Sequence, residues 1–263
     1  RPADHHLRRM YALADLYDGF LVDIDGVVLL GEDPIPGAVE ALASLAGAGK
    51  PYAFVTNNPR LSPDEHAEVL RSLGIEVPDE RMVTSAQTLV SLVLEGPGEG
   101  SRSVVIGTES FRGQVERAGI EPLPGEEWMR AESVMVSGHE LLTYGELRAA
   151  SMAAAGGVLF GATGRDPTMP MPDGPWPGTG AILAAIETAS GATATVTGKP
   201  EPAIFEAGLE AIGRPARVAM IGDRSDSDIA GAGAVGIDGI LVSAEEDPAG
   251  ADHLVGSLAE IVE

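Results

Sequence analysis

Short apolar or β-branched runs alternate with stretches of helical periodicity along the 263-residue chain. Such runs predict buried strands, whereas apolar residues that recur every three or four positions predict helices. The expected strands lie at 20–22, 52–55, 104–106, 134–136, 158–160, 193–197, 218–221 and 240–242, which we take as the last. The expected helices lie at 37–46, 62–74, before Gly119, at 143–155, at 182–189 and from Pro202 onward.

Two of these helices carry start signals in the sequence. Ser62-Pro63-Asp64-Glu65 combines an N-cap, a proline at the first helical position and a capping-box glutamate, and Thr143 with Glu146 forms a second capping box. A Pro- and Gly-rich loop is expected over 164–180. The alternation of strands and helices predicts an α/β protein whose Rossmann-like parallel sheet has helices on both faces.

Polar residues follow four of the predicted strands. Ligands of such sheets bind at the carboxyl ends of the strands, so these residues are the first candidates for a site. The four segments are Asp23-Ile24-Asp25-Gly26, Thr56-Asn57-Asn58, Gly198-Lys199-Pro200 and Gly222-Asp223-Arg224-Ser225-Asp226-Ser227-Asp228. Carboxylates, a hydroxyl, amides and a lysine at one sheet edge indicate metal-assisted phosphoryl chemistry.

Asp23 and Asp25 are two residues apart, so strand periodicity would point both side chains the same way, about 6–7 Å apart. With Asp223 near them, their charges need a cation or a bound proton. Mg²⁺ is the natural cation, because it prefers oxygen ligands and shares carboxylates with phosphate and water. The alternative is an Asx-turn at Asp25-Gly26, which would explain only one aspartate.

Only Lys50 and Lys199 are lysines in a chain that otherwise uses arginine. Lys50 follows Gly49 at a predicted helix end, where a cation suits the helix dipole. Lys199 has no such explanation, and a P-loop is excluded because Thr193 and Pro200 stand where glycine and serine or threonine belong. A lysine is informative where chemistry needs a compact point charge, the alternative being compositional drift, which leaves an occasional lysine anywhere.

Several features have plainer interpretations. Thr56-Asn57-Asn58 offers a hydroxyl and backbone N–H groups to a phosphate, but Asn-Asn-Pro is also a common turn. Among the later aspartates, Asp226 best fits a solvated loop. The G-x-G-x-x-G run at 231–236 precedes a strand instead of following one, so it indicates small-residue packing. The five histidines, two of them in the tail at His5 and His6, lack zinc-ligand spacing.

Composition narrows the function classes. A formal net charge of −23 argues against nucleic-acid binding, and the absence of cysteine excludes disulfides, thiolate metal sites and a cysteine nucleophile. No apolar run is long enough to span a membrane, and the N-terminus lacks an apolar signal segment. We expect a cytoplasmic protein. We also expect that its native sequence starts at Met10 and that residues 1–9 do not belong to it.

In order, D-I-D-G, T-N-N, G-K-P and G-D-R-S-D-S-D resemble the four signature motifs of the haloacid dehalogenase superfamily of phosphatases. The G-D-R-x-x-x-D form and the long segment between the second and third motifs resemble its subfamily IIA, which includes NagD, p-nitrophenylphosphatase and glycerol-phosphate phosphatase enzymes. The resemblance runs from about Phe20 to near the end of the chain. It implies a core at 15–89 and 195–263, with an inserted α/β cap domain at 90–194.

The resemblance also implies residue roles. Asp23 would be the nucleophile that forms an aspartyl-phosphate, and Asp25 the general acid and then base. Mg²⁺ would be held by Asp23, the Asp25 carbonyl and Asp223. The phosphoryl oxygens would be bound by Thr56, by the N–H groups of Gly26 and Asn57, and by Lys199, with help from Asn58. Asp228 would orient either Lys199 or a metal-bound water.

The implied activity is Mg²⁺-dependent hydrolysis of a small phosphate monoester, such as a sugar, glycerol or nucleotide phosphate. A phosphotransferase or mutase on the same core, or a catalytically inactive scaffold, are the alternatives; a receiver domain would be about half as long. The resemblance further implies a homodimer paired through the cap.

The cap departs from the family pattern in two places. Relatives usually show V-G-x-D near Ser137-Gly138-His139, and A-T-N-x-D where this chain has Ala162-Thr163-Gly164-Arg165-Asp166. His139, Arg165 and Asp166 are therefore the candidates for substrate specificity, the alternative being surface loops.

Overall fold

The computed structural model describes residues 12–31, 33–171, 174–244 and 250–263. The predictions on His5, His6, Met10 and residues 1–9 lie outside them. The chain divides into a core unit, which comprises the chain through Thr56, Asp64–Val83 and Lys199–Glu263, and an inserted unit, which comprises Asn57–Pro63 and Thr84–Gly198. The chain thus changes unit at 56/57, 63/64, 83/84 and 198/199. The domain boundaries expected at 89/90 and 194/195 stay predictions.

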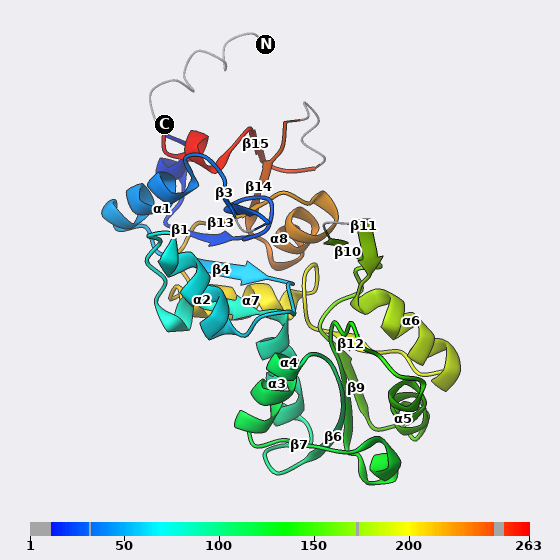
Figure 1. The fold of residues 1–263 in the computed structure, drawn as a ribbon. Coiled ribbons are helices and arrows are strands. Elements are labelled where there is room, and N and C mark those ends of the chain that lie inside the picture. The colour runs from blue at the N-terminus through cyan, green and yellow to red at the C-terminus, as the bar shows by residue number, and fades with distance from the viewer. Residues whose placement is uncertain (1–11, 32, 172–173, 245–249) are drawn as a thin grey trace. The chain divides into compact units, whose positions relative to one another are not determined.

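The core unit is built on a six-stranded sheet with the order β15-β14-β13-β1-β4-β5 (Figure 1). β1 pairs in parallel with β13 and β4, β13 with β14, and β14 with β15. The strands are β1 (Gly19–Val22), β4 (Tyr52–Thr56), β5 (Met82–Thr84), β13 (Val218–Gly222), β14 (Asp238–Val242) and β15 (His253–Val255). A two-stranded antiparallel pair, β2 (Leu29–Leu30) and β3 (Asp33–Pro34), follows β1.

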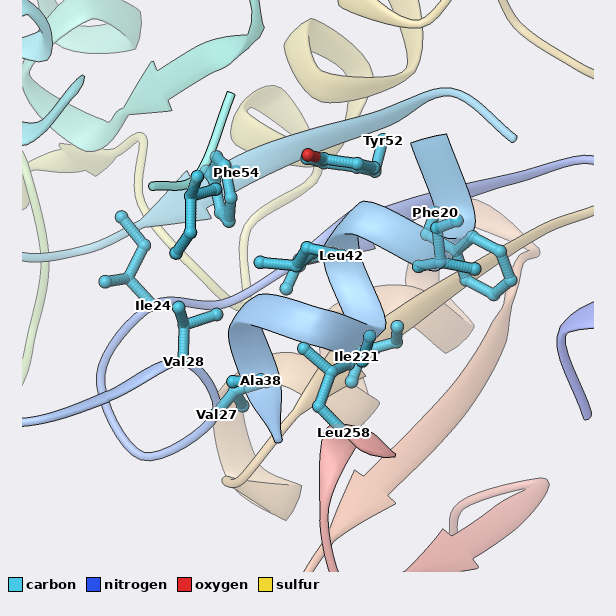
Figure 2. Close-up of a cluster of buried hydrophobic side chains, with 14 of the residues drawn as sticks. Phe20, Ile24, Val27, Val28, Ala38, Leu42, Tyr52, Phe54, Ile221 and Leu258 are labelled. Atoms are coloured by element: carbon cyan, nitrogen blue, oxygen red, sulfur yellow. The ribbon is translucent and has the colours of Figure 1, made fainter. Parts of the chain in front are cut away.

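Successive residues of β1 point to opposite faces of this sheet, as strand geometry requires. Phe20 and Val22 join one hydrophobic cluster and Leu21 joins another. Figure 2 shows the first cluster, in which Ala38 and Leu42 lie among side chains from three strands. The helices are α1 (Ala38–Gly47) and α2 (Pro63–Ser72) on that face, and α7 (Pro202–Ala211) and α8 (Ala230–Val235) on the other.

Besides the α-helices and strands, the described part of the chain has five short helical segments. They are η1 (Leu13–Leu16), η2 (Asp79–Arg81), η3 (Gly125–Arg130), η5 (Leu258–Ile261) and the π-helical turn η4 (Ser225–Ile229). No helix among the described residues is long and apolar enough to cross a membrane.

The inserted unit has its own five-stranded parallel sheet with the order β12-β9-β8-β6-β7. Its strands are β6 (Arg102–Ile106), β7 (Glu121–Pro122), β8 (Ser133–Val136), β9 (Leu159–Ala162) and β12 (Thr195–Val196). The helices α3 (Ser85–Glu95) and α4 (Glu109–Arg117) pack on one face, and α5 (Tyr144–Ala155) and α6 (Thr179–Ser190) on the other. An antiparallel hairpin is formed by β10 (Thr168–Met171) and β11 (Gly174–Pro177).

The predicted fold class is confirmed: parallel sheets have helices on both faces. The Thr143–Glu146 capping box is present in both directions. The run at 231–236 is small-residue packing at its first glycine, because a Cβ on Gly231 would lie 2.2 Å from the Phe205 ring.

Other predictions of secondary structure were wrong. The strand at 240–242 is not the last, since β15 follows it. The loop expected over 164–180 contains the β10–β11 hairpin, and α3 was not predicted at all. Lys50, by contrast, follows the end of α1 as expected, and its Nζ donates to the Tyr17 carbonyl at 2.5 Å, which links the chain before β1 to the end of α1.

Candidate active site

The carboxyl ends of three neighbouring strands of the core sheet bring polar residues together. β1 pairs Val22 with Phe54 of β4 and with Ile221 of β13, and the Asp23 N–H extends this ladder to the Ile221 carbonyl. Asp23 therefore begins the loop after β1 between the end of β4, where Thr56 is buried, and the end of β13, which Asp223 follows. This is the edge at which the sequence predicted a site.

Lys199 reaches the same edge by a route that differs from the prediction. We expected it to follow a strand of the core sheet, but β12 pairs with β9 in the sheet of the inserted unit. Lys199 instead lies in the turn before α7 and is the first residue of its segment of the core unit. The local sequence of residues 193–197 identified a strand but not its pairing partner.

A buried ion-pair cluster forms around this lysine. Lys199 Nζ lies 2.7 Å from Asp23 Oδ1 and 2.6 Å from Asp228 Oδ1, and all three side chains are nearly inaccessible to solvent. Asp228 comes from η4, and its other oxygen accepts the Arg224 backbone N–H at 3.1 Å. One ammonium thus bridges two carboxylates in a region of low dielectric constant, where charge interactions are strong.

The pKa values of the cluster follow from burial and neighbouring charge. Burial raises the pKa of Asp23 to about 8; the Lys199 ammonium opposes this rise, and the Asp228 and Asp25 charges add to it. Burial alone would lower the pKa of Lys199, but Asp228 and Asp23 outweigh it and raise that pKa. Burial and the Asp228 charge also raise the pKa of Asp223. With all three carboxylates ionised, the cluster would hold more negative charge than Lys199 neutralises, and burial together with this excess charge raises the pKa values of Asp23 and Asp223.

The donor set fits a divalent cation of the magnesium type. Carboxylate oxygens of Asp23, Asp223 and Asp228 lie within 4.8 Å of one another. Among the described residues, Asp223 Oδ1 is buried and has no hydrogen-bond partner. Oxygen ligands from carboxylates are those that Mg²⁺ and Ca²⁺ prefer, so a cation here would both complete the coordination of Asp223 and offset the excess charge.

Gly26 makes room for this arrangement. Its φ is +86°, and a Cβ at this position would lie 2.1 Å from Asp223 Oδ2. Only glycine adopts such a conformation readily and also leaves the space free for the carboxylate. The Gly26 N–H meanwhile donates to the Leu29 carbonyl at 2.7 Å.

Asp23 and Asp25 do not form the matched pair that strand periodicity predicted. β1 ends at Val22, so both aspartates lie beyond the strand, and the chain turns at Gly26. The Asp23 side chain is buried, whereas Asp25 is exposed and its backbone forms an isolated β-bridge with Leu29. The two carboxylates thus have different environments, and the roles of nucleophile and acid expected for them stay predictions.

Asn57 and Asn58 belong to the inserted unit, although Thr56 belongs to the core unit. Asn57 Nδ2 donates to Asp166 Oδ2 at 3.4 Å. Asn58 Oδ1 accepts the Arg60 N–H at 3.2 Å and so shapes the turn that the sequence suggested. The phosphate-binding roles predicted for these residues and for Thr56 stay predictions.

The three specificity candidates all have partners within the inserted unit. His139 Nε2 lies 3.5 Å from Glu146 Oε1, and Asp166 contacts Asn57. Arg165 forms two contacts with Glu187, of 3.0 and 2.8 Å, which fix the loop after β9 to α6. Asp226 pairs with Arg224 on the surface, in agreement with a solvated loop.

Sequence reasoning missed the buried hydroxyls around Asn57. They belong to Ser85, Thr88 and Thr197, and their contacts are described below. The signal was available: Thr84 and Gln87 form a capping box, present in both directions, ahead of an apolar run. It predicts α3 and places Ser85 at the start of that helix.

Comparison with known families agrees with this geometry. The haloacid dehalogenase-like hydrolase family matches residues 20–121, and a HAD-hydrolase-like family matches residues 196–261. The two matched segments carry the residues of the buried cluster. The chain belongs to the haloacid dehalogenase-like hydrolase family.

Two of three similar proteins have names that identify them as phosphatases. D-glycerol 3-phosphate phosphatase of Mycobacterium tuberculosis is 36% identical over 89% of this chain and 65% of its own length, so the chain spans about two thirds of that relative. Chronophin of Mus musculus is 40% identical over 80% of this chain and 75% of its own. Acid sugar phosphatase of Staphylococcus aureus is 32% identical over 86% of both.

Solved structures share the whole fold. p-Nitrophenyl phosphatase from Archaeoglobus fulgidus superposes with a TM-score of 0.86 at 30% identity, over 94% of this chain and 98% of that one. Glycerol phosphate phosphatase from Mycobacterium tuberculosis, in complex with magnesium, has a TM-score of 0.85 at 31% identity, over 97% and 79%.

Proposed function

We propose that this protein is a magnesium-dependent phosphatase that hydrolyses a small phosphate monoester through an aspartyl-phosphate. The observation that carries the proposal is the buried Lys199 ammonium, 2.7 Å from Asp23 and 2.6 Å from Asp228, with Asp223 beside them. A lysine paired with one buried carboxylate would be a structural ion pair. A lysine shared among neighbouring carboxylates cannot neutralise all of them when they are ionised, so the group favours a bound cation. That cation and Lys199 would then bind the phosphate ester.

In the first half of the reaction, Asp23 attacks phosphorus. A bond forms between a carboxylate oxygen and phosphorus while the bond to the ester oxygen breaks. Asp25 is exposed to the solvent side of the loop and donates a proton to the departing oxygen, which leaves as an alcohol. Lys199 offsets charge on the phosphoryl oxygens and on Asp23 during this transfer.

In the second half, water attacks phosphorus and the bond to Asp23 breaks. Asp25 takes a proton from that water, so both residues return to their starting states and inorganic phosphate is released. Thr56, Asn57 and Asn58 are the proposed ligands of the phosphoryl oxygens. The Gly26 N–H, expected from the sequence as a further ligand, donates to the Leu29 carbonyl and would have to share that bond. Asp228 holds Lys199 in place throughout.

The cation is the remaining component. Asp23, Asp223 and the Asp25 carbonyl would hold Mg²⁺, which when bound neutralises charge on the phosphoryl group and aligns it. The magnesium complex of the mycobacterial glycerol phosphate phosphatase supports this assignment.

The relatives support a small substrate. The names of two refer to glycerol 3-phosphate and to sugar, which supports glycerol and sugar phosphates as the first candidates, ahead of nucleotides. His139 and Arg165 remain the proposed specificity residues. Pairing of two copies through residues 90–194 and a cytoplasmic location stay predictions.

The test is phosphate release from p-nitrophenyl phosphate, glycerol phosphates, sugar phosphates and nucleoside monophosphates, with and without Mg²⁺. We expect Mg²⁺-dependent release with one ester preferred, and none from Asp23→Asn. The control is Asp226→Asn, which removes an exposed carboxylate from the same group of motifs and should keep wild-type activity. Release by folded Asp23→Asn would exclude the proposed nucleophile. No release from any ester would favour a transferase or a scaffold.

A further inference from the structure

Asn57 is held from several sides within the inserted unit. Its side-chain amide donates to Asp166 Oδ2 at 3.4 Å, and its backbone carbonyl accepts the Ser85 hydroxyl at 3.4 Å. The Asn57 side-chain oxygen faces Gly198, where a Cβ would lie only 2.5 Å away. Both its side chain and its backbone are therefore restrained, although it lies in a loop.

The Asp166 side of this arrangement is itself well anchored. The Asp166 carbonyl accepts the Gly180 N–H at 2.8 Å, at the start of α6. A Cβ on Gly180 would lie 2.2 Å from the Arg165 carbonyl, so the helix start and the loop after β9 touch backbone to backbone. Arg165 adds its paired contacts with Glu187, and Glu187 also accepts the Ala194 N–H at 2.9 Å. The contacts of the loop after β9 with α6 thus fix the position of Asp166.

The Gly198 side is equally crowded. A Cβ there would lie 2.2 Å from the Thr163 carbonyl and 3.0 Å from the Ser85 side chain. The preceding residue, Thr197, is buried and donates to the Ser85 carbonyl at 3.2 Å. Thr88 donates to the same carbonyl at 2.9 Å and to the Thr197 carbonyl at 3.3 Å. These hydroxyls fasten the start of α3 to the chain just before Gly198.

The covalent neighbours of these two residues give the arrangement its importance. Asn57 directly follows Thr56, and Gly198 directly precedes Lys199. A restraint on Asn57 and Gly198 is therefore a restraint on the backbone that enters both proposed phosphate-binding residues. Displacement of a binding group by about 1 Å can lower a rate by about a hundredfold.

We propose that Asp166 and Gly198 are positioning residues for phosphoryl transfer, which they serve by holding Asn57 so that its N–H is aimed at the phosphoryl group. This inference rests on the proposed function. It gives Asp166 a role that differs from the specificity role expected from the sequence. A specificity residue touches the leaving group, whereas a positioning residue acts on the phosphoryl group that every ester shares.

The experiment compares Asp166→Ala with Asp166→Asn on the ester panel. Asp166→Asn keeps an oxygen that can accept the Asn57 amide, so it should stay within about threefold of wild type. Asp166→Ala should lower kcat by between about tenfold and about a hundredfold, by the same factor for each ester, including p-nitrophenyl phosphate. An effect that differs from ester to ester would overturn the positioning role and favour contact with the leaving group. Unchanged rates in Asp166→Ala would also overturn the positioning role.

A second readout does not depend on turnover. Inorganic phosphate carries no leaving group, so its calorimetric Kd for the Mg²⁺-loaded protein should rise in Asp166→Ala and recover in Asp166→Asn. Gly198→Ala should raise it too; if that variant does not fold, the Asp166 pair carries the test. Glu132→Ala is the control, because it removes an exposed partner of Arg102 in the same unit. Wild-type protein that neither binds phosphate nor hydrolyses an ester would refute the proposed function, and this inference with it.

Discussion

Replacement of Lys199 by methionine tests the electrostatics of the site most directly. Methionine has a similar length and no charge, so Lys199→Met leaves the Asp23 and Asp228 carboxylates buried without their shared cation. Asp223 adds a third carboxylate nearby. The variant should therefore be less stable as well as inactive.

The size of the effect follows from the distances. Above about pH 8, where Asp23 is ionised, unit charges separated by 2.6 to 2.7 Å attract by about 6 kcal/mol per pair at an effective dielectric constant of about 20. The cost of burying the three groups offsets most of this attraction, and removal of one partner from a buried ion pair costs about 3–5 kcal/mol in practice. For a chain of this size that loss lowers the thermal midpoint by on the order of 10 °C.

The assay is chemical and thermal unfolding without Mg²⁺, followed by the same measurement with Mg²⁺. Part of the lost stability should return with the metal, because it neutralises the same carboxylates. Arg214→Met is the matched control: Arg214 also bridges two carboxylates, Glu206 and Glu210, but on the surface, where solvent screens the charges. An unfolding free energy of Lys199→Met within about 1 kcal/mol of wild type would refute the assigned electrostatics.

Three further outcomes follow from the same site. Lys199→Arg should lose most activity although charge is kept, because a planar guanidinium does not fit where a buried ammonium touches two carboxylates; full activity measured on p-nitrophenyl phosphate would contradict this. Gly26→Ala should weaken Mg²⁺ binding at least tenfold by calorimetry, since its Cβ would displace Asp223; an unchanged Kd would show that the loop adapts. The folded-state pKa of Asp23 is raised from 3.8 to about 8, so the metal-free protein holds a proton that the unfolded chain releases, and its stability should fall as pH rises from about 4 to about 8. Mg²⁺ should therefore raise the thermal midpoint more at pH 8 than at pH 5. An equal rise at both pH values would contradict the assigned pKa.

Local sequence patterns were sufficient to predict the fold class and the residues of the buried cluster. The apolar runs around Leu21, Phe54 and Met220 are long enough to identify buried strands, and the polar residues that follow them lie at one edge because the strands are parallel. Lys199 stood out because the chain uses arginine almost everywhere else. These inferences needed only short-range information.

The misjudged features depend on contacts between distant segments. The pattern at 193–197 predicts a strand, but nothing local says that Thr195–Val196 pairs with β9 instead of β1. The different exposure of Asp23 and Asp25 arises where β1 ends and Gly26 turns the chain, so strand periodicity no longer applies there. The Pro- and Gly-rich composition of 164–180 hid a hairpin whose strands are only four residues long.

The second motif shows why a contiguous sequence motif need not act as one structural element. Thr56 ends a strand of the core unit, whereas Asn57 is the first residue of the inserted unit and has contacts with Asp166, Ser85 and Gly198. Sequence spacing treats the two residues as one phosphate-binding turn. In the structure, the hydroxyl of that turn is positioned by the core sheet and the amide by residues up to 141 positions away along the chain (198 − 57). If Asn57 binds phosphate as proposed, substitutions in the inserted segment should be judged by what they do to Asn57 as well as by what they do to the substrate.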